Sequence, residues 1–217
     1  MLALIFDHDG TLVDSERHHF EVWRQILQPF GVRFSETDYI RHHNGVPTPQ
    51  NAATLIEQHG LDIDVDSLCE RKNTAFADYA TSTPSPLLPT VLETLKRARS
   101  HGRKMAIATG ADTQDVMRSV NAHALNPLFD AIATRSEVKL GKPAPDVYLL
   151  ACERLQARPQ QAVAFEDTQT GIAAAKAAGL YCIAIPNHYS LHQDLSQADA
   201  RCETLAEAYT LAQSREQ

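Results

Sequence analysis

Short apolar segments alternate with longer amphipathic ones through most of the chain. Five apolar runs predict buried β-strands, over 2–6, 105–108, 131–133, 162–165 and 181–185. Segments with helical periodicity lie between the later runs, over 91–100, 115–122, 145–155 and 170–178, and Gly179 is expected to end the last of them. Because strands that alternate with helices pair in parallel, this pattern predicts a doubly wound α/β core with helices on both faces of the sheet.

The segment 16–82 has helical periodicity and lacks strand-like runs. One apolar face is expected on a helix that ends near Gly31, formed by side chains three or four residues apart: Phe20, Trp23, Leu27 and Phe30. A capping box at 35–38 predicts the start of a second helix, and 51–59 and 66–79 are expected to form two more. Three prolines in 83–89 interrupt any further helix. We therefore predict a core domain, 1–15 with 83–217, and an inserted helical domain, 16–82.

Composition narrows the class of protein. Hydrophobic residues make up 43% of the 217 residues and charged residues 22%, values that are typical of a globular protein with a real core. The formal net charge of −7, without a basic run, disfavours nucleic acid as a partner. Because the first residues lead directly into a strand-like run, no signal sequence is expected, and no apolar stretch reaches membrane-spanning length. Four scattered cysteines indicate reduced thiols. We expect a cytoplasmic protein without a membrane partner, and a monomer, since no apolar stripe is left over.

Candidate chemistry follows the predicted strands. In open parallel sheets, ligands bind beyond the carboxyl ends of the strands. The residues expected at this edge are Asp7 and Asp9 after the first strand, Thr109 and Gly110 after the second, Lys142 in the loop after the third, and Glu166 and Asp167 at the end of the fourth. Carboxylates gathered at one point repel one another unless a cation lies among them. An oxygen-only ligand set suits Mg²⁺ better than Zn²⁺.

Roles for these residues follow from phosphoryl-transfer chemistry. Asp7 is the candidate nucleophile, as in enzymes that form an aspartyl phosphate. Asp9 lies two residues further on and is placed for proton transfer to the leaving oxygen. Lys142 would offset negative charge on the phosphoryl oxygens. Thr109 and the backbone N–H of Gly110 would donate hydrogen bonds to them. The simpler interpretation of Thr109 is as the N-cap of the following helix, and the two roles are compatible.

Four motifs together resemble the haloacid dehalogenase superfamily, most closely its β-phosphoglucomutase-like sugar phosphatases. They are Asp7-x-Asp9-Gly10-Thr11 followed by Asp14-Ser15-Glu16, then Ile107-Ala108-Thr109-Gly110, then Gly141-Lys142-Pro143-Ala144-Pro145-Asp146, and finally Phe165-Glu166-Asp167 with Gly171-Ile172. The resemblance covers the whole chain. It implies a Rossmann-like core with a helical cap inserted after the first strand. It also implies that Mg²⁺ is held by Asp7, the backbone carbonyl of Asp9, Glu166 and Asp167.

The resemblance also suggests substrate contacts in the cap. His19 and Lys72 match cap positions of the mutases, and Asn44 and Gly45 belong to a loop expected to reach the substrate. Each has a simpler interpretation: His19 as a residue at a helix start, and the loop as an ordinary turn between helices. Asp14, Ser15 and Glu16 are interpreted as a helix cap rather than as substrate contacts.

The expected activity is a Mg²⁺-dependent phosphatase that hydrolyses a small phosphorylated metabolite, a sugar phosphate, through an aspartyl phosphate on Asp7. A β-phosphoglucomutase-like mutase is the nearest alternative, but Thr48 stands where such mutases carry an arginine that grips a second phosphate. A dehalogenase is disfavoured because that branch lacks the second aspartate. From another class, a phospho-accepting signalling module gathers a similar residue set but releases no product through turnover.

Overall fold

The computed structural model describes residues 2–82 and 84–215. The chain forms two compact units. Met1–Asp14 and Pro86–Gln217 make up the first, here called the core unit, and Ser15–Ser85 make up the second, called the cap unit. The predicted domain limits at 15/16 and 82/83 stay a prediction.

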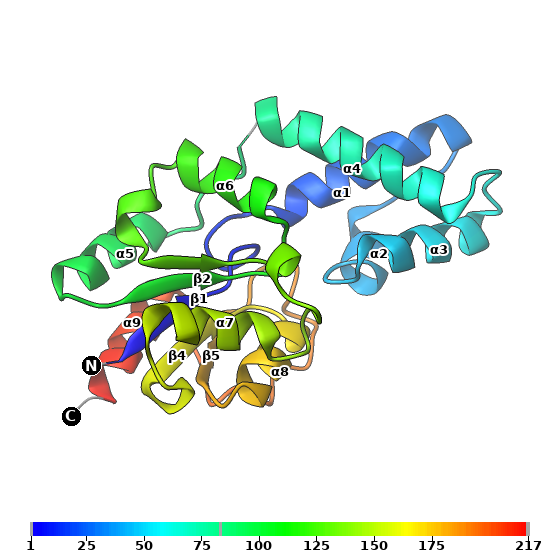
Figure 1. Ribbon diagram of the computed structural model, residues 1–217. Helices are drawn as coiled ribbons and strands as arrows, with labels where there is room; N and C mark the ends of the chain where they lie inside the picture. The colour runs from blue at the N-terminus through cyan, green and yellow to red at the C-terminus, as the bar shows by residue number, and fades with distance from the viewer. Residues whose placement is uncertain (1, 83, 216–217) are drawn as a thin grey trace. The chain divides into compact units, whose positions relative to one another are not determined.

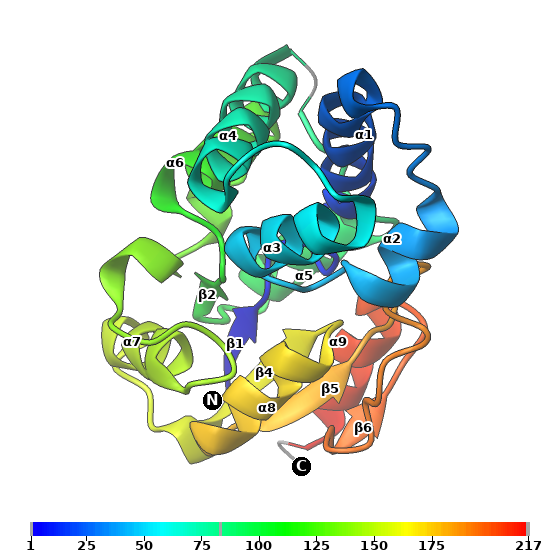
Figure 2. The same ribbon diagram turned by 90° about the vertical axis from the view of Figure 1, so that its right-hand side faces the viewer.

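The core unit contains a six-stranded sheet in the order β3-β2-β1-β4-β5-β6. Its strands are β1 (Ala3–Phe6), β2 (Met105–Ala108), β3 (Ala131–Ala133), β4 (Ala162–Glu166), β5 (Tyr181–Ala184) and β6 (Ala200–Arg201). All neighbouring pairs are parallel, as predicted, and β1, β4 and β5 run side by side in Figure 2. The chain order reverses at β1, with β2 on one side and β4 on the other, and such a switch point is where open sheets bind ligands.

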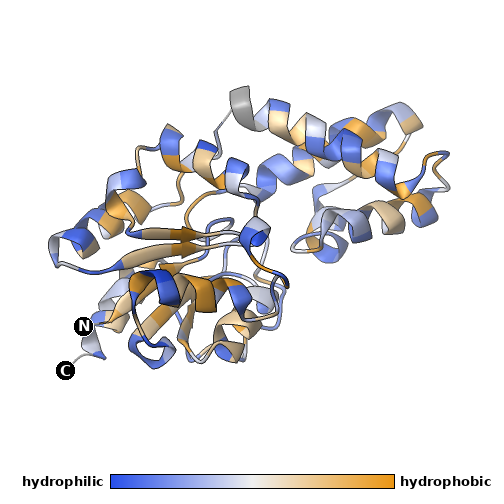
Figure 3. Ribbon diagram, viewed as in Figure 1, coloured by the Kyte–Doolittle hydropathy of each residue, from blue (hydrophilic) through white to orange (hydrophobic). Residues whose placement is uncertain are grey.

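Helices cover both faces of this sheet (Figure 1). They are α5 (Val91–Ser100), α6 (Thr113–Ala122), α7 (Asp146–Leu155), α8 (Gln169–Ala177) and α9 (Leu205–Ser214). One buried cluster joins the strands to α7 and α8, and a second joins them to α5, α6 and α9. Both faces of the strands are therefore apolar, which explains their continuous apolar runs, and Figure 3 shows the strands mainly in the hydrophobic colours.

The cap unit consists of helices α1 (Glu16–Leu27), α2 (Glu36–His42), α3 (Thr48–His59) and α4 (Val65–Ser82), with a short 3₁₀ turn, Gln28–Phe30, after α1. The apolar face predicted for the first helix is buried at Phe20, Trp23 and Leu27. The fourth predicted member, Phe30, lies in the 3₁₀ turn after α1 and is only partly buried. Ser35 caps α2, because its side chain accepts a hydrogen bond from the backbone N–H of Asp38. Gly31 and Gly60 follow their helices at positive φ, 77° and 59°, a conformation that glycine adopts without strain.

The elements differ from the sequence prediction in a few places. Strand β6 and helix α9 were not predicted, and α3 begins three residues earlier than the predicted 51–59, at Thr48. Pro49 lies in the first turn of α3, where its missing N–H has no helical partner to lose. No helix in the described part of the chain combines the length and the apolar character needed to cross a membrane.

Candidate active site

The first strand delivers two carboxylates to the edge of the sheet. Asp7 follows β1 directly, and its backbone N–H donates to the carbonyl of Phe165 on the neighbouring β4, at 2.9 Å. The chain then turns at Gly10, whose φ is 79°, and the Gly10 N–H donates to the carbonyl of Val13 at 2.8 Å. Strand pairing thus fixes the backbone at Asp7, and the turn brings Asp9 back toward the same edge.

Lys142 joins two of the predicted site residues. Its Nζ lies 2.5 Å from Asp7 Oδ1 and 2.5 Å from Glu166 Oε1. The lysine side chain is only 10% exposed, and the Glu166 side chain is fully buried. An ammonium between two carboxylates at such distances forms strong, charge-assisted hydrogen bonds. The loop after β3 and the ends of β1 and β4 are therefore held together by charge.

Glu166 accepts further hydrogen bonds at both oxygens. The Tyr148 hydroxyl of α7 donates to Oε1 at 2.7 Å, and the backbone N–H of Asp167 donates to Oε2 at 3.2 Å. The backbone N–H and hydroxyl of Thr168 also donate to Oε2, at 3.4 and 3.3 Å. A Cβ at Gly171 would lie 2.0 Å from Oε1, so only glycine leaves room for this carboxylate beneath α8. Glu166 is thus rigidly held, and Lys142 and Tyr148 occupy one of its oxygens.

Burial and charge shift the pKa values of this cluster. Burial, with the nearby carboxylates of Glu166 and Asp9, raises the pKa of Asp7 to about 7 despite the proximity of Lys142. Burial alone would lower the pKa of Lys142, but attraction to Asp7 and Glu166 outweighs it and raises that pKa. Burial and the Glu166 carboxylate hold the pKa of Tyr148 well above its usual value. Lys142 stays protonated and Tyr148 stays a hydrogen-bond donor, whereas the Asp7 carboxylate needs further positive charge to ionise fully below neutral pH.

Asp167 completes the acidic group. It is 2% exposed, and the Thr11 hydroxyl lies 3.5 Å from its Oδ1. Asn187, in the loop after β5, donates to Oδ2 at 2.8 Å. One carboxylate oxygen from each of Asp7, Glu166 and Asp167 lies within 4.8 Å of the others. Buried oxygens at this spacing fit a hard divalent cation, which would also relieve their mutual repulsion.

His8 separates the two aspartates of the first motif and is itself 3% exposed. Its Nδ1 lies 3.3 Å from Asp9 Oδ2. Burial disfavours the charged ring, but the Asp9 carboxylate outweighs that effect and raises the pKa of His8. Asp9 is the more exposed partner, with 28% of its side chain accessible. The Asp9 carboxyl therefore has a buried partner on one side and access to solvent, as a proton-transfer group requires.

Thr109 and Gly110 follow β2, the strand that pairs with β1. Both therefore lie at the same edge of the sheet as Asp7. The Thr109 side chain is buried, and its Oγ1 accepts a hydrogen bond from the Ala111 N–H at 3.0 Å. The alternative interpretation of Thr109 as the cap of the next helix is wrong, because α6 begins at Thr113 with Asp112 at the N-cap.

In the cap unit, His19 and Lys72 share one aromatic ring. The His19 ring stacks on Phe76 with the ring centroids 4.1 Å apart and the planes at 1°. The Lys72 Nζ lies 4.6 Å from the centroid of the same Phe76 ring. Helices α1 and α4 thus bring these two predicted substrate contacts together on the cap. Their roles stay a prediction.

The loop between α2 and α3 carries Asn44 and Gly45, the other predicted substrate contacts. Asn51, on α3, stabilises this loop, because its Nδ2 donates to the carbonyls of His43 at 2.8 Å and Val46 at 3.1 Å. Its Oδ1 pairs with His43 Nδ1 at 2.8 Å. Burial lowers the pKa of His43, so its ring is neutral at neutral pH and donates this bond from Nδ1.

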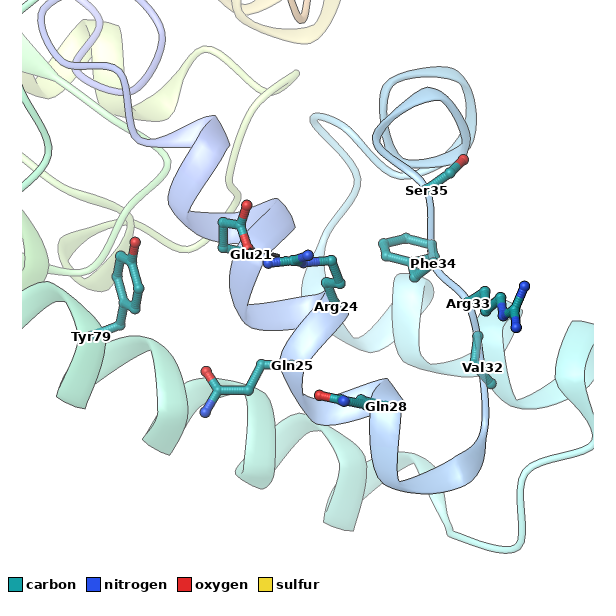
Figure 4. Close-up of a pocket in the computed structure, with 9 residues that line it drawn as sticks. All are labelled: Glu21, Arg24, Gln25, Gln28, Val32, Arg33, Phe34, Ser35 and Tyr79. Carbon is teal, nitrogen blue, oxygen red and sulfur yellow. Dashed lines mark hydrogen bonds and ion pairs between the residues drawn. The ribbon is translucent and has the colours of Figure 1, made fainter.

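The cap unit also contains a separate pocket of about 540 Å³ (Figure 4). Its lining comes from α1, the segment after it and α4, and comprises Glu21, Arg24, Gln25, Gln28, Val32, Arg33, Phe34, Ser35 and Tyr79. Two of these lining residues form an ion pair, with Arg24 Nη2 2.5 Å from Glu21 Oε2. None of the predicted site residues lines this pocket.

Several residues that were not predicted from the sequence contact the predicted site, among them Tyr148, Asn187 and Asn51. Tyr148 meets Glu166, Asn187 meets Asp167, and Asn51 supports the loop of Asn44. Asn187 and Asn51 each lie outside the four motifs, so spacing alone carries no signal for them. Tyr148 lies two residues after the third motif, on a helix where a tyrosine is typical of the core.

Comparisons with known proteins identify related chains. The family model of the haloacid dehalogenase-like hydrolases matches residues 4–185. The fructose-1-phosphate phosphatase YqaB of Escherichia coli is 37% identical over 82% of this chain and 93% of its own length. A phosphorylated carbohydrates phosphatase of Thermotoga maritima is 33% identical over 83% and 82%.

A solved structure shows the same fold over nearly the whole chain. The crystal structure of CbbY from Rhodobacter sphaeroides in complex with phosphate superimposes with a TM-score of 0.81 at 28% identity, covering 95% of this chain and 96% of that one. The family model spans both the acidic cluster and the helical insert. The chain therefore belongs to the haloacid dehalogenase-like hydrolases.

Proposed function

We propose that this hydrolase is a Mg²⁺-dependent phosphatase that removes the phosphoryl group of a small phosphorylated sugar through an aspartyl phosphate on Asp7. The observation that carries the proposal is the buried cluster at the carboxyl edge of the sheet, in which Lys142 lies 2.5 Å from both Asp7 and Glu166. Phosphoryl transfer depends mainly on positioning and on stabilising negative charge, and this cluster supplies both.

Asp7 is the nucleophile of the proposed reaction. Its carboxylate attacks phosphorus, and the bond from phosphorus to the sugar oxygen breaks. Lys142 holds one Asp7 oxygen at 2.5 Å, which fixes the carboxylate and favours its ionised form. Thr109 and the Gly110 N–H follow β2, the strand that pairs with β1, and would donate hydrogen bonds to the phosphoryl oxygens.

Asp9 moves the protons. It gives its proton to the departing sugar oxygen, then takes a proton from the water that attacks the phosphorus of the aspartyl phosphate. The bond from phosphorus to Asp7 then breaks, which releases inorganic phosphate and restores both carboxyls. His8 Nδ1, 3.3 Å from Asp9 Oδ2, steadies the Asp9 carboxylate between the two transfers.

Haloacid dehalogenase-like hydrolases generally use a divalent metal, and the acidic cluster fits one. We assign Mg²⁺ to Asp7, the backbone carbonyl of Asp9, and Asp167 with Glu166. When bound, the ion would neutralise charge on the phosphoryl oxygens. The hard oxygen ligands favour Mg²⁺ over softer metals.

The substrate class rests on the relatives. YqaB is named a fructose-1-phosphate phosphatase, and the Thermotoga maritima relative is named a phosphorylated carbohydrates phosphatase. On that basis we propose that the substrate of this chain is also a sugar phosphate. In the cap unit, the loop of Asn44 and Gly45 and the pair of His19 and Lys72 on Phe76 are the proposed contacts to the sugar.

A phosphate-release screen tests the proposal. The purified chain with Mg²⁺ is given sugar 1-phosphates and 6-phosphates, phosphorylated sugar acids and polyols, nucleotides and a generic aryl phosphate. We expect many equivalents of phosphate per chain from at least one sugar phosphate, and none after chelation of the metal. Release of at most one equivalent would favour a phospho-accepting module, and an isomeric sugar phosphate without phosphate release would favour a mutase.

A further inference from the structure

Asn187 connects three parts of the core unit at the acidic cluster. It lies in the loop that follows β5, outside the four motifs. Its Nδ2 donates one hydrogen bond to the carbonyl of Gly10 and one to Asp167 Oδ2, both at 2.8 Å. One side chain therefore ties the turn after β1 to the end of β4.

The carboxamide of Asn187 is held in a single orientation. Its Oδ1 accepts from the backbone N–H groups of Tyr189 at 2.8 Å and Ser190 at 3.2 Å. The Asn187 backbone N–H donates to the hydroxyl of Ser190, which is itself fully buried, at 3.0 Å. If the amide were turned over, an oxygen would face two acceptors and an NH₂ would face two donors. The contacts at Oδ1 thus dictate that Nδ2 points at Gly10 and Asp167.

The turn at Gly10 lies close to both Asp167 and Asn187. A Cβ added at Gly10 would lie 2.3 Å from Asp167 Oδ2 and 2.7 Å from Asn187 Nδ2. The Asp167 carboxylate and the Asn187 carboxamide thus leave no room for a side chain at position 10. A displacement of the Asn187 side chain would therefore also displace the Asp167 carboxylate.

We propose that Asn187 is a positioning residue that orients the Asp167 carboxylate and the motif turn at Gly10 for the divalent cation. The inference rests on the proposed function, since it takes the cluster as the metal site. Hydrogen bonds from outside the ligand set fix the direction of ligand oxygens, and their loss typically weakens metal binding or activity about 10- to 100-fold. Without Asn187, a buried oxygen of Asp167 also loses a hydrogen-bond donor.

The test is a direct measurement of cation affinity on the chelator-treated full chain. Mg²⁺ is titrated calorimetrically, and Mn²⁺ is titrated in parallel by electron paramagnetic resonance. Asn187→Ala removes the carboxamide, and Asn187→Leu keeps a similar volume without the hydrogen bonds. Gln193→Ala is the matched control, because Gln193 lies in the same loop and its carboxamide accepts from the Gln169 N–H at 2.8 Å instead.

We expect both Asn187 variants to bind the cations about 10- to 100-fold more weakly than the parent chain, with an unchanged circular dichroism spectrum. Gln193→Ala should bind within about twofold of the parent, on the same scale of effects. Excess Mg²⁺ should restore most of the turnover of the Asn187 variants, because the defect lies in affinity.

Other outcomes overturn the inference. Unchanged cation affinity in folded Asn187 variants would remove the positioning role, and loss of the fold in both variants would make Asn187 a purely structural residue. If the parent chain itself bound no divalent cation, the proposed metal-dependent function would fail first. The measurement on the parent chain thus separates the two failures.

Discussion

The two units hold their polar groups in different ways. In the core unit, charged side chains from the ends of β1 and β4 and from the loop after β3 are buried against one another, and Lys142 pairs with both Asp7 and Glu166. In the cap unit, His19 and Lys72 rest on the ring of Phe76, and a neutral carboxamide supports the loop of Asn44. The first arrangement depends on charge, and the second on ring contacts and neutral hydrogen bonds.

This difference predicts that the two units have different roles in the proposed reaction. Strand ends in a parallel sheet are fixed by backbone pairing on both sides, so groups attached to them keep a common geometry for any substrate. A loop between two helices is fixed by few contacts and tolerates change more readily. We therefore expect substitutions in the core cluster to affect turnover of every substrate equally, and substitutions in the cap to change the order of preference among substrates.

Asp7→Asn should produce the largest effect. The amide is nearly isosteric with the carboxylate but is a poor nucleophile, so turnover of every substrate should fall by on the order of 10⁴-fold or more. The comparison is made on the preferred sugar phosphate and on an aryl phosphate, with the circular dichroism spectrum as the check on folding. Turnover near the parent rate on either substrate would remove Asp7 from the nucleophilic role.

Lys142→Met should come next, and it should affect stability as well as turnover. The substitution leaves the buried carboxylates of Asp7 and Glu166 without their shared cation, and breaking a buried pair in this way costs about 3–5 kcal/mol. Chemical denaturation measures the loss. Lys139→Met is the matched control, because Lys139 lies three residues earlier in the same loop and is exposed. Equal stability of the two variants would contradict a structural role for the buried charge cluster.

The core cluster was largely predictable from sequence, for a physical reason. An apolar run followed by a carboxylate marks the end of a buried strand, and parallel pairing then places such ends at one edge. Asp7, Glu166 and Asp167 satisfy that rule, and the structure brings them within 4.8 Å. The motif carrying Lys142 located the lysine, but only the fold shows that it contacts two carboxylates.

Other features were beyond the reach of a sequence pattern. Strand β6 has two residues, Ala200 and Arg201, too few to establish a period. Asn187 contacts Gly10 and Asp167, which lie 177 and 20 positions earlier in the chain. Tyr148 lies on the apolar face of a helix, so the sequence pattern indicates a core residue and does not predict the contact that its hydroxyl makes. Contacts of this kind are set by tertiary packing, which periodicity does not encode.

The pH dependence of stability in the metal-free chain tests the charge-based half of the comparison. The folded state raises the pKa of Asp7 from 3.8 to about 7, so between these values the folded state binds more protons than the unfolded state. The free energy of unfolding should therefore fall as the pH rises from about 4 to about 7, by at most about 4 kcal/mol from this group.

Asp7→Asn should remove the contribution of Asp7 to this pH dependence. Other carboxyls, whose pKa values are lowered in the folded state, contribute equally to parent and variant, so the difference between the two curves gives the contribution of Asp7 alone. Urea denaturation at several pH values, in the presence of a chelator, measures the slope. Addition of Mg²⁺ to the parent should flatten it, because a bound cation favours the ionised carboxylate. Parallel curves for parent and variant would show that the Asp7 carboxyl ionises as easily in the folded state as in the unfolded one.

Asn51→Ala should give the smallest effect, and it bears on the cap. The substitution removes hydrogen bonds to the carbonyls of His43 and Val46, and it leaves the buried Nδ1 of His43 without its acceptor. We expect a loss of about 1–3 kcal/mol in stability, since buried polar groups lose their partners.

The same change should separate the substrates. A loop that no longer holds Asn44 in place should raise KM for the preferred sugar phosphate about tenfold, on the scale of one lost interaction, and should leave hydrolysis of an aryl phosphate nearly unchanged. Gln50→Ala, one residue earlier and exposed, is the control and should change neither value. An equal loss of kcat on both substrates would break the comparison, because it would mean that the cap loop supports the chemical step itself rather than the choice of sugar.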